Sequence, residues 1–212
     1  MYRVLFLVFL FLGLSVAPAP GQEVSLPDVQ DAYEALDGLQ ASFTQVIGSS
    51  FADGSTRVEG SVLLSGNRYR VNTPDQTVVS DGTTTWIYTP ADNQVVVNDA
   101  DTEGAVTPET FLTASADRYK VESSTSASRR GTPHVRLTLV ATDSSSRFAE
   151  ATLWVRRADQ VVTRMRARDR NGSTLDLRLR DLVVNPEALH SETPFRFTAP
   201  SGVEVVDLRQ SE

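Results

Sequence analysis

Few residues of this sequence are of types that do covalent or metal chemistry. There is no cysteine, and His134 and His190 have no second histidine or spaced acid nearby to complete a metal site. The acidic stretch at residues 98–103, NDADTE, lacks the spaced ligands and the terminal glutamate of a twelve-residue calcium loop. Nucleophile-elbow, zinc-protease and phosphate-loop motifs do not occur. We therefore expect no catalytic residue, no metal and no cofactor, and a protein that is not an enzyme. A lipid hydrolase or transferase would need an activated nucleophile.

A run of alternating arginines is a second candidate for chemistry. Arg164, Arg166 and Arg168 share one face of a predicted strand and could bind an anionic headgroup or a partner. A solvated sheet face that Asp176 balances in part explains the same pattern, and we favour it because surface charge runs are usually of this kind. The formal net charge of −7 at pH 7 argues against nucleic acid, whose phosphates require a basic face.

The aromatic pair Trp86 and Tyr88 indicates non-covalent chemistry. Both residues fall on one face of a strand within QTVVSDGTTTWIYTPADNQVVVND, residues 76–99, between Thr-, Asp- and Gly-rich flanks. Large rings are a compact lining for a pocket that takes an apolar ligand. The core of a β protein would use the same rings, so both interpretations stay open at this point.

The N-terminus indicates export. Residues 1–21 contain a basic start at Arg3, a short apolar run and the small residues Ala19 and Gly21 around Pro20, which is typical of a cleaved signal peptide rather than of a membrane anchor. Cleavage near Gly21 would leave residues 22–212 as one domain without disulfides.

The elements that must position these residues are one helix and many strands. Ser25, Pro27 and Asp28 predict the start of an amphipathic helix of about three turns, which Gly38 ends in the left-handed conformation. After Leu39 the apolar period is two, and short turns separate eleven stretches, which predicts antiparallel neighbours. Only VTPETFLTASA, residues 106–116, interrupts with a second, short helix.

The hairpin TRMRARDRNGSTLDLRLRD can be assigned by parity. A three-residue loop at Arg170–Gly172 with Gly172 in the left-handed region pairs Met165 with Leu177 and Ala167 with Leu175. The arginines then lie on the opposite, wet face. We therefore expect a mainly β (α+β) fold: a single curved antiparallel sheet forming an incomplete barrel, covered by the N-terminal helix and a short lid helix. Such a sheet would leave an apolar cavity.

Four stretches together resemble the LolA-type periplasmic lipoprotein carriers. VVSDGTTTWIYTPADNQV is similar to the hallmark segment of the family, LQASFTQ has its aromatic and Gln (Phe43, Gln45), GSVLLSGNRYRV resembles the next strand pair, and FRFTAPSGVEVVD resembles the closing strand. The resemblance spans nearly all of residues 22–212. It implies an incomplete barrel with helices acting as a lid.

The resemblance also implies a function. Such carriers accept acylated lipoproteins from an inner-membrane ABC exporter, shield the acyl chains in the periplasm and deliver the lipoprotein to an outer-membrane acceptor. We expect a monomer that binds no nucleic acid. The residues expected to line its acyl-chain cavity are Phe43, Leu63, Tyr69, Val71, Trp86, Tyr88, Phe111, Leu112, Met165, Leu175 and Leu177.

The sequence departs from the family at one point. Ser65 and Gly66 stand where many carriers have an Arg-Pro pair whose arginine is implicated in holding the lid closed, and parity puts Arg68 and Arg70 on the face opposite Tyr69. The departure leaves room for an alternative: a lipid- or lipoprotein-sensing domain of the same fold in envelope stress signalling. Sensors of that kind usually carry an additional C-terminal domain, whereas this sequence ends soon after the closing strand, which favours the carrier.

Overall fold

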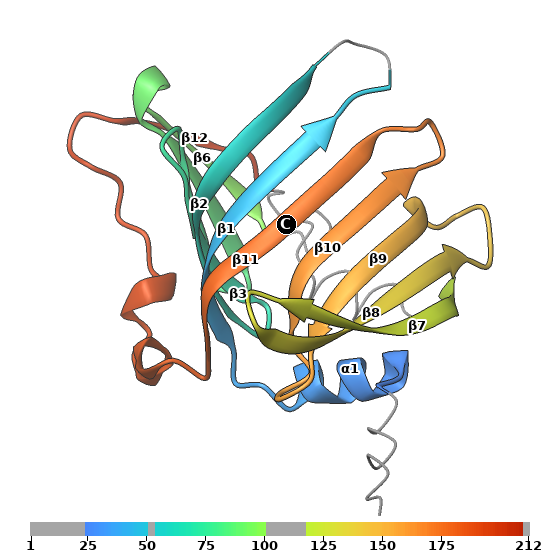
Figure 1. The fold of residues 1–212 in the computed structure, drawn as a ribbon. Coiled ribbons are helices and arrows are strands. Elements are labelled where there is room, and N and C mark those ends of the chain that lie inside the picture. The colour runs from blue at the N-terminus through green and yellow to red at the C-terminus, as the bar shows by residue number, and fades with distance from the viewer. Residues whose placement is uncertain (1–23, 51–53, 101–117, 210–212) are drawn as a thin grey trace, which may run out of the picture.

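In the part of the chain that the structure describes, the fold is one large curved sheet with a single α-helix against its inner side (Figure 1). It is seen in a computed structural model that describes residues 24–50, 54–100 and 118–209. The predicted signal peptide (residues 1–21) and the predicted lid helix with Phe111 and Leu112 lie outside the described residues. Among those described, no helix has both the length and the apolar character needed to cross a membrane.

Twelve strands in the described part of the chain belong to this sheet, and eleven of them correspond to the stretches predicted from the two-residue period. The strands are β1 (Leu39–Gly48), β2 (Ser55–Ser65), β3 (Arg68–Asn72), β4 (Thr77–Ser80), β5 (Thr84–Thr89), β6 (Gln94–Asp99), β7 (Tyr119–Arg129), β8 (Thr132–Ala141), β9 (Phe148–Arg156), β10 (Val162–Asp169), β11 (Thr174–Val184) and β12 (Glu204–Asp207).

The order across the sheet is β12-β6-β5-β4-β3-β2-β1-β11-β10-β9-β8-β7. The sheet does not close, because β12 and β7 are free edges of this order, and the prediction of one open, curved antiparallel sheet is confirmed. The exception is β12, which pairs with β6 in parallel. Most of the predicted closing strand is not strand: Thr193–Phe195 form the 3-10 helix η4, and only Glu204–Asp207 join the sheet.

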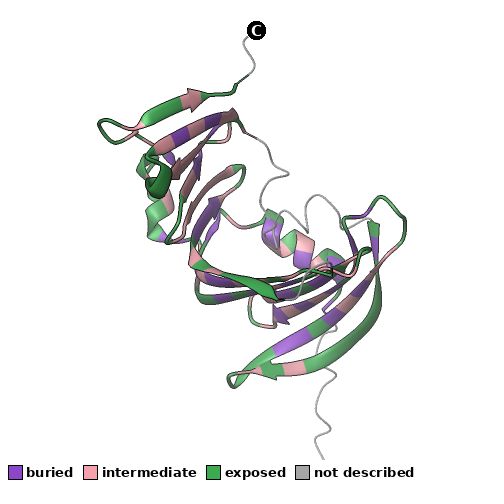
Figure 2. Cartoon of the chain, turned by 90° about the horizontal axis from the view of Figure 1, so that it is seen from above, coloured by how far each residue is buried: buried purple, intermediate pink, exposed green. Residues whose placement is uncertain are grey.

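Helix α1 (Leu26–Glu34) begins as predicted and ends earlier. The Ser25 hydroxyl accepts from the backbone N–H of Asp28, whose carboxylate accepts in return from the backbone N–H of Ser25 at 2.8 Å. Its buried residues Leu26, Val29 and Tyr33 face the sheet, and the Tyr33 hydroxyl accepts from the N–H of Val162 at 3.1 Å. Figure 2 shows the sheet curving around this helix.

Gly38 does not end the helix, which is a correction to the sequence prediction. The helix stops at Glu34, and Ala35 caps it in the right-handed conformation. Gly38 instead enters β1 with φ +156°, where a Cβ atom would lie 2.0 Å from the carbonyl oxygen of Leu64. The glycine is therefore required by the close approach of two backbones rather than by helix termination.

Register divides every strand into an inner face, which turns toward α1, and an outer face. The three-residue hairpin loop is confirmed: Met165 lies opposite Leu177, Ala167 lies opposite Leu175, and Gly172 has φ +89°. The inner face of β8–β11 is a dry core in which many side chains are fully buried. These residues include Leu137, Leu139, Leu153, Val155 and Met165.

The outer face of β10 and β11 carries paired charges. The carboxylate of Asp176 accepts hydrogen bonds from Arg164 (2.6 and 2.9 Å) and Arg178 (2.8 and 3.2 Å), and Arg166 lies 3.3 Å away. Burial on its own would raise the pKa of Asp176, but the hydrogen bonds and charges of Arg164 and Arg178 outweigh it and hold this pKa well below its usual range. Arg168 pairs with Glu150 instead, at 2.7 Å. Each arginine of the series therefore has a carboxylate partner on its own sheet, although Arg164 and Arg166 share Asp176 with Arg178.

Replacement of Gly38 by alanine should destabilise the fold. The added methyl group would meet the Leu64 carbonyl, so the two strands or the α1–β1 connection must shift, and we expect a loss of about 2 kcal/mol or more in unfolding free energy. Gly66→Ala is the control, because nothing lies within 4 Å of its added Cβ and it should cost only about 1 kcal/mol for its φ of +58°. Urea denaturation of both variants checks this, and equal losses would contradict it.

Asp176→Asn should lower stability in a pH-dependent way. A depressed pKa in the folded state stabilises the protein above the unfolded-state pKa of about 3.9, and this contribution is lost as the pH falls toward the folded-state value. We expect a deficit of about 2 kcal/mol at neutral pH, which shrinks as the pH is lowered below about 4.

The control for this prediction is Glu150→Gln, since the Arg168–Glu150 pair is half exposed and should contribute less than about 0.5 kcal/mol. Urea denaturation at several pH values is the measurement. A deficit of Asp176→Asn that is unchanged between neutral pH and about pH 3 would show that Asp176 acts by packing rather than by charge.

Candidate functional site

The inner face of β2–β6 carries one continuous apolar row. Direct cross-strand partners join these residues from strand to strand, so their side chains lie side by side on the same face. We call this set the valine row: Val62, Val71, Val78, Ile87 and Val96. Ala41 of β1 continues it toward the dry core.

The valine row is less covered than the core beside it. Val62, next to β1, is buried, whereas Val71, Val78, Ile87 and Val96 are each only half-buried. On the same face of β8 and β9 the core leucines are completely buried. Burial therefore decreases along the inner face from the half that α1 covers to the half that holds the valine row (Figure 2). Half-covered apolar surface of this kind can accept an apolar ligand.

The polar groups on this face are uncharged. A second row next to the valine row contains Tyr69, Ser80 and Thr85, and the Tyr69 hydroxyl lies 3.5 Å from that of Thr85. By register, none of the inner-face residues of β1–β6 in the described chain is charged. The surface can thus hold an apolar group without an ionic anchor that would fix its position.

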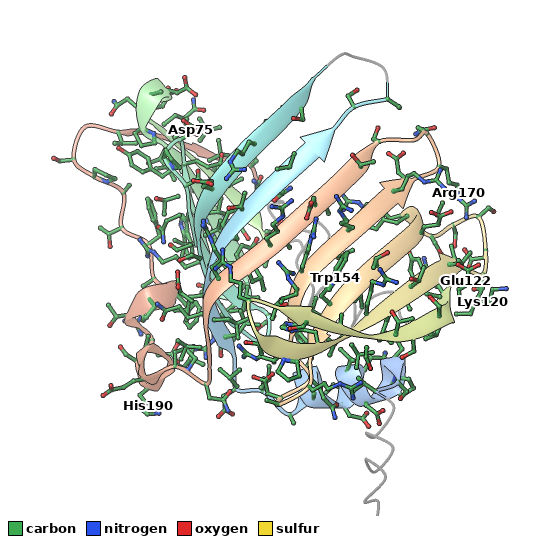
Figure 3. All side chains as sticks on the ribbon, viewed as in Figure 1. Asp75, Lys120, Glu122, Trp154, Arg170 and His190 are labelled. Carbon is green, nitrogen blue, oxygen red and sulfur yellow. The ribbon has the colours of Figure 1, made fainter. Side chains whose placement is uncertain are left out.

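Side chains project from both faces of the sheet (Figure 3), and the strand register divides the predicted cavity residues between these two faces. Six lie on the inner face, and three of these, Met165, Leu175 and Leu177, are buried in the dry core. Tyr69 and Val71 lie at the half-covered end, and Phe43 lies between the two parts. Three others occupy the outer face: Leu63, Trp86 and Tyr88.

The grouping of Trp86 and Tyr88 with Tyr69 in one cavity is wrong. Tyr69 aligns with Ser80 and Thr85, so Trp86, the next residue along β5, points to the other side of the sheet. There the rings of Trp86 and Tyr88 pack on Phe197, with centroids 6.5 and 6.1 Å apart. The aromatic pair holds the C-terminal segment against the outer face.

Leu63 is on the outer face for the same reason, since its partners are Gln40 and Arg70. Cross-strand partners can be counted in the sequence outward from the Asp81–Gly82 turn. This count separates the two faces and identifies Val78, Ile87 and Val96 as inner-face residues. These three residues were not predicted as lining, because the aromatic rings of Trp86 and Tyr88 are the most conspicuous apolar side chains of this segment.

Ser65, which stands where many carriers have the arginine implicated in holding the lid closed, is also on the outer side of the sheet. Arg68 donates to Ser65 at 3.2 Å, pairs with Glu192 at 2.7 Å and lies 4.7 Å from the centre of the Phe195 ring. Arg70 donates to the carbonyl of Pro194 at 3.2 Å. The predicted parity of Arg68 and Arg70 is confirmed, and both residues fix the C-terminal segment rather than anything on the inner face.

The residues first considered for catalysis or metal binding have structural roles or stand alone. His134 is buried, and its ring nitrogens lie 2.9 Å from the Thr132 carbonyl and from the Thr163 hydroxyl. His190 ends the short helix η3 (Glu187–His190) at the surface. Within residues 24–50, 54–100 and 118–209, no group of three or more His, Cys, Asp and Glu side chains could hold a metal ion.

The described sheet thus presents an uncharged, half-covered apolar face, and this chain can be compared with known proteins of similar sequence and fold. The family model described as "Outer membrane lipoprotein carrier protein LolA" matches residues 34–198. The chain therefore belongs to the outer-membrane lipoprotein carrier family. Two relatives with that name come from Sodalis glossinidius (27% identical over 211 residues, 95% of this chain and 96% of the relative) and Aliivibrio salmonicida (27% over 190 residues, 86% and 89%).

Solved structures share the fold at lower identity. An uncharacterized conserved protein from Thermus thermophilus superposes with a TM-score of 0.57 at 16% identity, covering 87% of this chain and 99% of that one. MucB, whose complex with MucA from Pseudomonas aeruginosa has also been solved, superposes with a TM-score of 0.51 at 17% identity, covering 85% of this chain and 65% of MucB.

A carboxylate introduced at Tyr69 and one introduced at Trp86 should affect dye binding differently, because these two residues lie on different faces of the sheet. Tyr69→Glu places a carboxylate on the inner face and should weaken binding of an uncharged apolar fluorescent dye such as N-phenyl-1-naphthylamine by about tenfold or more, because an unpaired charge opposes apolar contact. Trp86→Glu places the same charge on the outer face and should leave dye affinity within about twofold of the parent. Circular dichroism checks that both variants fold. Dye binding lost in Trp86→Glu and kept in Tyr69→Glu would reverse the assignment.

Proposed function

We propose that this protein is a periplasmic carrier that binds the acyl chains of lipoproteins on the inner face of its sheet and transfers them from the inner to the outer membrane. The observation that carries the proposal is the valine row, half-buried and uncharged on the open half of the sheet, in a chain of the carrier family.

The energetics of an acyl chain agree with such a surface. Each buried methylene gains about 0.8 kcal/mol, so even part of a chain laid along the valine row competes with release into water. A carrier must also let go of its cargo. Because the inner face of the described β1–β6 offers no charged anchor, affinity depends on apolar contact alone, and transfer to a more apolar site downstream is favourable.

The remaining parts of the proposal follow from the family and the sequence. Export by a signal peptide that is cleaved near Gly21 places the protein in the periplasm. The donor is an inner-membrane ABC lipoprotein exporter and the recipient an outer-membrane acceptor, and the protein acts as a monomer without cofactor or catalytic step. Phe111 and Leu112 are proposed as lid residues over the acyl chains.

A release assay tests the proposal. The purified protein is added to spheroplasts that carry a labelled outer-membrane lipoprotein, and a soluble one-to-one complex is expected. Val78→Glu should reduce release by at least about tenfold, because its carboxylate enters the valine row.

Thr77→Glu is the matched control for this assay. Thr77 is the neighbouring residue on β4, is half-buried like Val78, and points to the outer face, so its charge should leave release almost unchanged. Equal loss in both variants would argue that release depends on net charge or stability rather than on the valine row.

A second candidate function is a sensor of lipid or mislocalised lipoprotein. It is favoured by the shared fold with MucB, which has been solved in complex with MucA. A sensor would bind an acylated peptide through the same valine row but would release no lipoprotein from spheroplasts. That combination of results would replace the carrier proposal by the sensor.

A further inference from the structure

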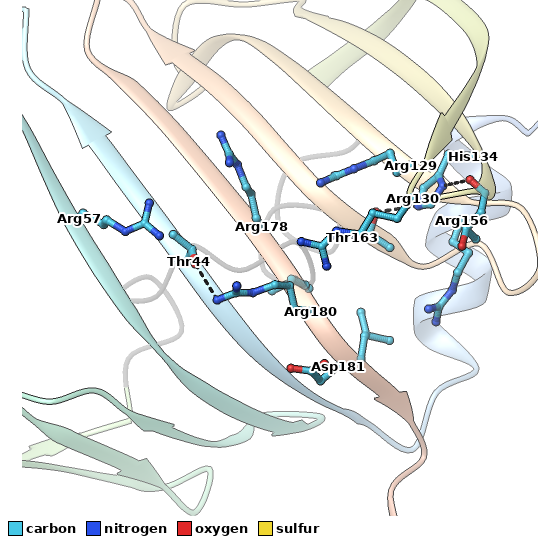
Figure 4. Close-up of a pocket in the computed structure, with 13 residues that line it drawn as sticks. Thr44, Arg57, Arg129, Arg130, His134, Arg156, Thr163, Arg178, Arg180 and Asp181 are labelled. Carbon is cyan, nitrogen blue, oxygen red and sulfur yellow. Dashed lines mark hydrogen bonds between the residues drawn. The ribbon is translucent and has the colours of Figure 1, made fainter.

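A pocket of about 400 Å³ opens on the outer face of the sheet, away from the valine row (Figure 4). Its walls come from β1, β2 and β11 on one side and from the β7–β8 turn on the other. Thr44, His134 and Thr163 contribute further polar groups. This volume lies within the range of small-molecule sites.

The charge of the lining is strongly one-sided. Asp181 is the one carboxylate among the residues that line the pocket in the described chain, against six arginines: Arg57, Arg129, Arg130, Arg156, Arg178 and Arg180. The whole chain, by contrast, is acidic with a pI near 4.9. A basic pocket in an acidic protein concentrates anions locally.

Three of these arginines already have carboxylate partners outside the lining. Arg57 pairs with Glu59, Arg156 with Asp159, and Arg178 with Asp176. The other three, Arg129, Arg130 and Arg180, have no carboxylate within 4 Å among the described residues. Arg180 donates to the Thr44 hydroxyl, at 3.3 Å.

Arg129 is the most unusual of the three. Its Nη1 atom is buried and has no hydrogen-bond partner in the described part of the chain. Burial lowers the pKa of Arg129, and repulsion from Arg164 and Arg178 lowers it further. A buried guanidinium donor without an acceptor is costly, so an acceptor from a ligand would be favourable here.

The β7–β8 turn holds Arg129 and Arg130 over the pocket. Arg130 and Gly131 both have positive φ, +50° and +80°, which is the pattern of a tight hairpin turn in which Asn-Gly is preferred. Arg129 lies 5.9 Å from the centre of the Trp154 ring on β9 and points toward Arg178 of β11 (Figure 4). Arg130 thus occupies a turn position with positive φ, where asparagine or aspartate is usually preferred.

We propose that this pocket binds an anion that carries a phosphate group. A tetrahedral phosphate has enough charge and acceptor oxygens for several arginines at once, whereas one carboxylate offers a single charge and two oxygens. The pocket has room for the organic group attached to the phosphate as well. The ligand is therefore a phosphorylated small molecule or a phospholipid headgroup, and its binding is independent of acyl binding on the inner face.

Calorimetric titration of the purified protein with inorganic pyrophosphate, and sedimentation with phosphatidylcholine vesicles that contain or lack phosphatidylglycerol, test the proposal. We expect one pyrophosphate site whose affinity falls as NaCl is raised. The double variant Arg129→Gln/Arg180→Gln should weaken it by at least about tenfold. Arg166→Gln/Arg168→Gln removes the same charge from the outer face outside the pocket and should change affinity by less than about twofold.

The two probes separate the sources of the phosphate. Binding of phosphatidylglycerol vesicles that is lost in the pocket variant would identify a lipid headgroup, and binding of pyrophosphate alone would identify a soluble phosphorylated ligand. Absence of binding to both probes, or equal losses in the pocket and control variants, would overturn the proposal. Thermal unfolding of each variant shows that it is folded.

Discussion

The cross-strand register of one open sheet is the constraint on which the rest of the structure depends. Successive residues of a strand point to opposite sides of the sheet, and residues directly opposite each other on neighbouring strands point to the same side. From β2 to β6 the pairing has no register shift, so the same face continues across all five strands. Val71, Val78, Ile87 and Val96 are consequently on one face, and Arg70, Val79 and Trp86 on the other. A slip by one residue would exchange these two surfaces.

Coverage of the inner face then determines which part is core and which part stays accessible. Helix α1 lies against the inner side of β8–β11, where Leu137 and Met165 are fully buried, and the same face is only half covered at the valine row. The C-terminal segment packs on the outer side through Phe195 and Phe197. Each half of the sheet is thus stabilised from a different side, and apolar surface remains on the inner face.

The fold is predictable from the sequence because its signals are local. The Ser25–Asp28 cap, the two-residue period and the Arg170–Gly172 loop are each determined within a few residues, and all three are present in the structure. The site was less predictable. Whether Trp86 faces Tyr69 depends on register across three strands, and the role of Phe197 depends on a segment more than a hundred residues further along the chain. The basic pocket joins β1, β2, β11 and the β7–β8 turn, so no single stretch of sequence reveals it.

The most direct measurement is photocrosslinking from the two faces of β5. A photoreactive amino acid replaces Ile87 in one variant and Trp86 in the other. The two positions are adjacent in the sequence but lie on opposite faces of the sheet. Each protein would be loaded with an acyl-labelled lipoprotein and irradiated. The account predicts an adduct with the acyl chain from position 87 and little or none from position 86. An adduct that forms mainly from position 86 would contradict it, because the acyl chain would then lie on the outer face.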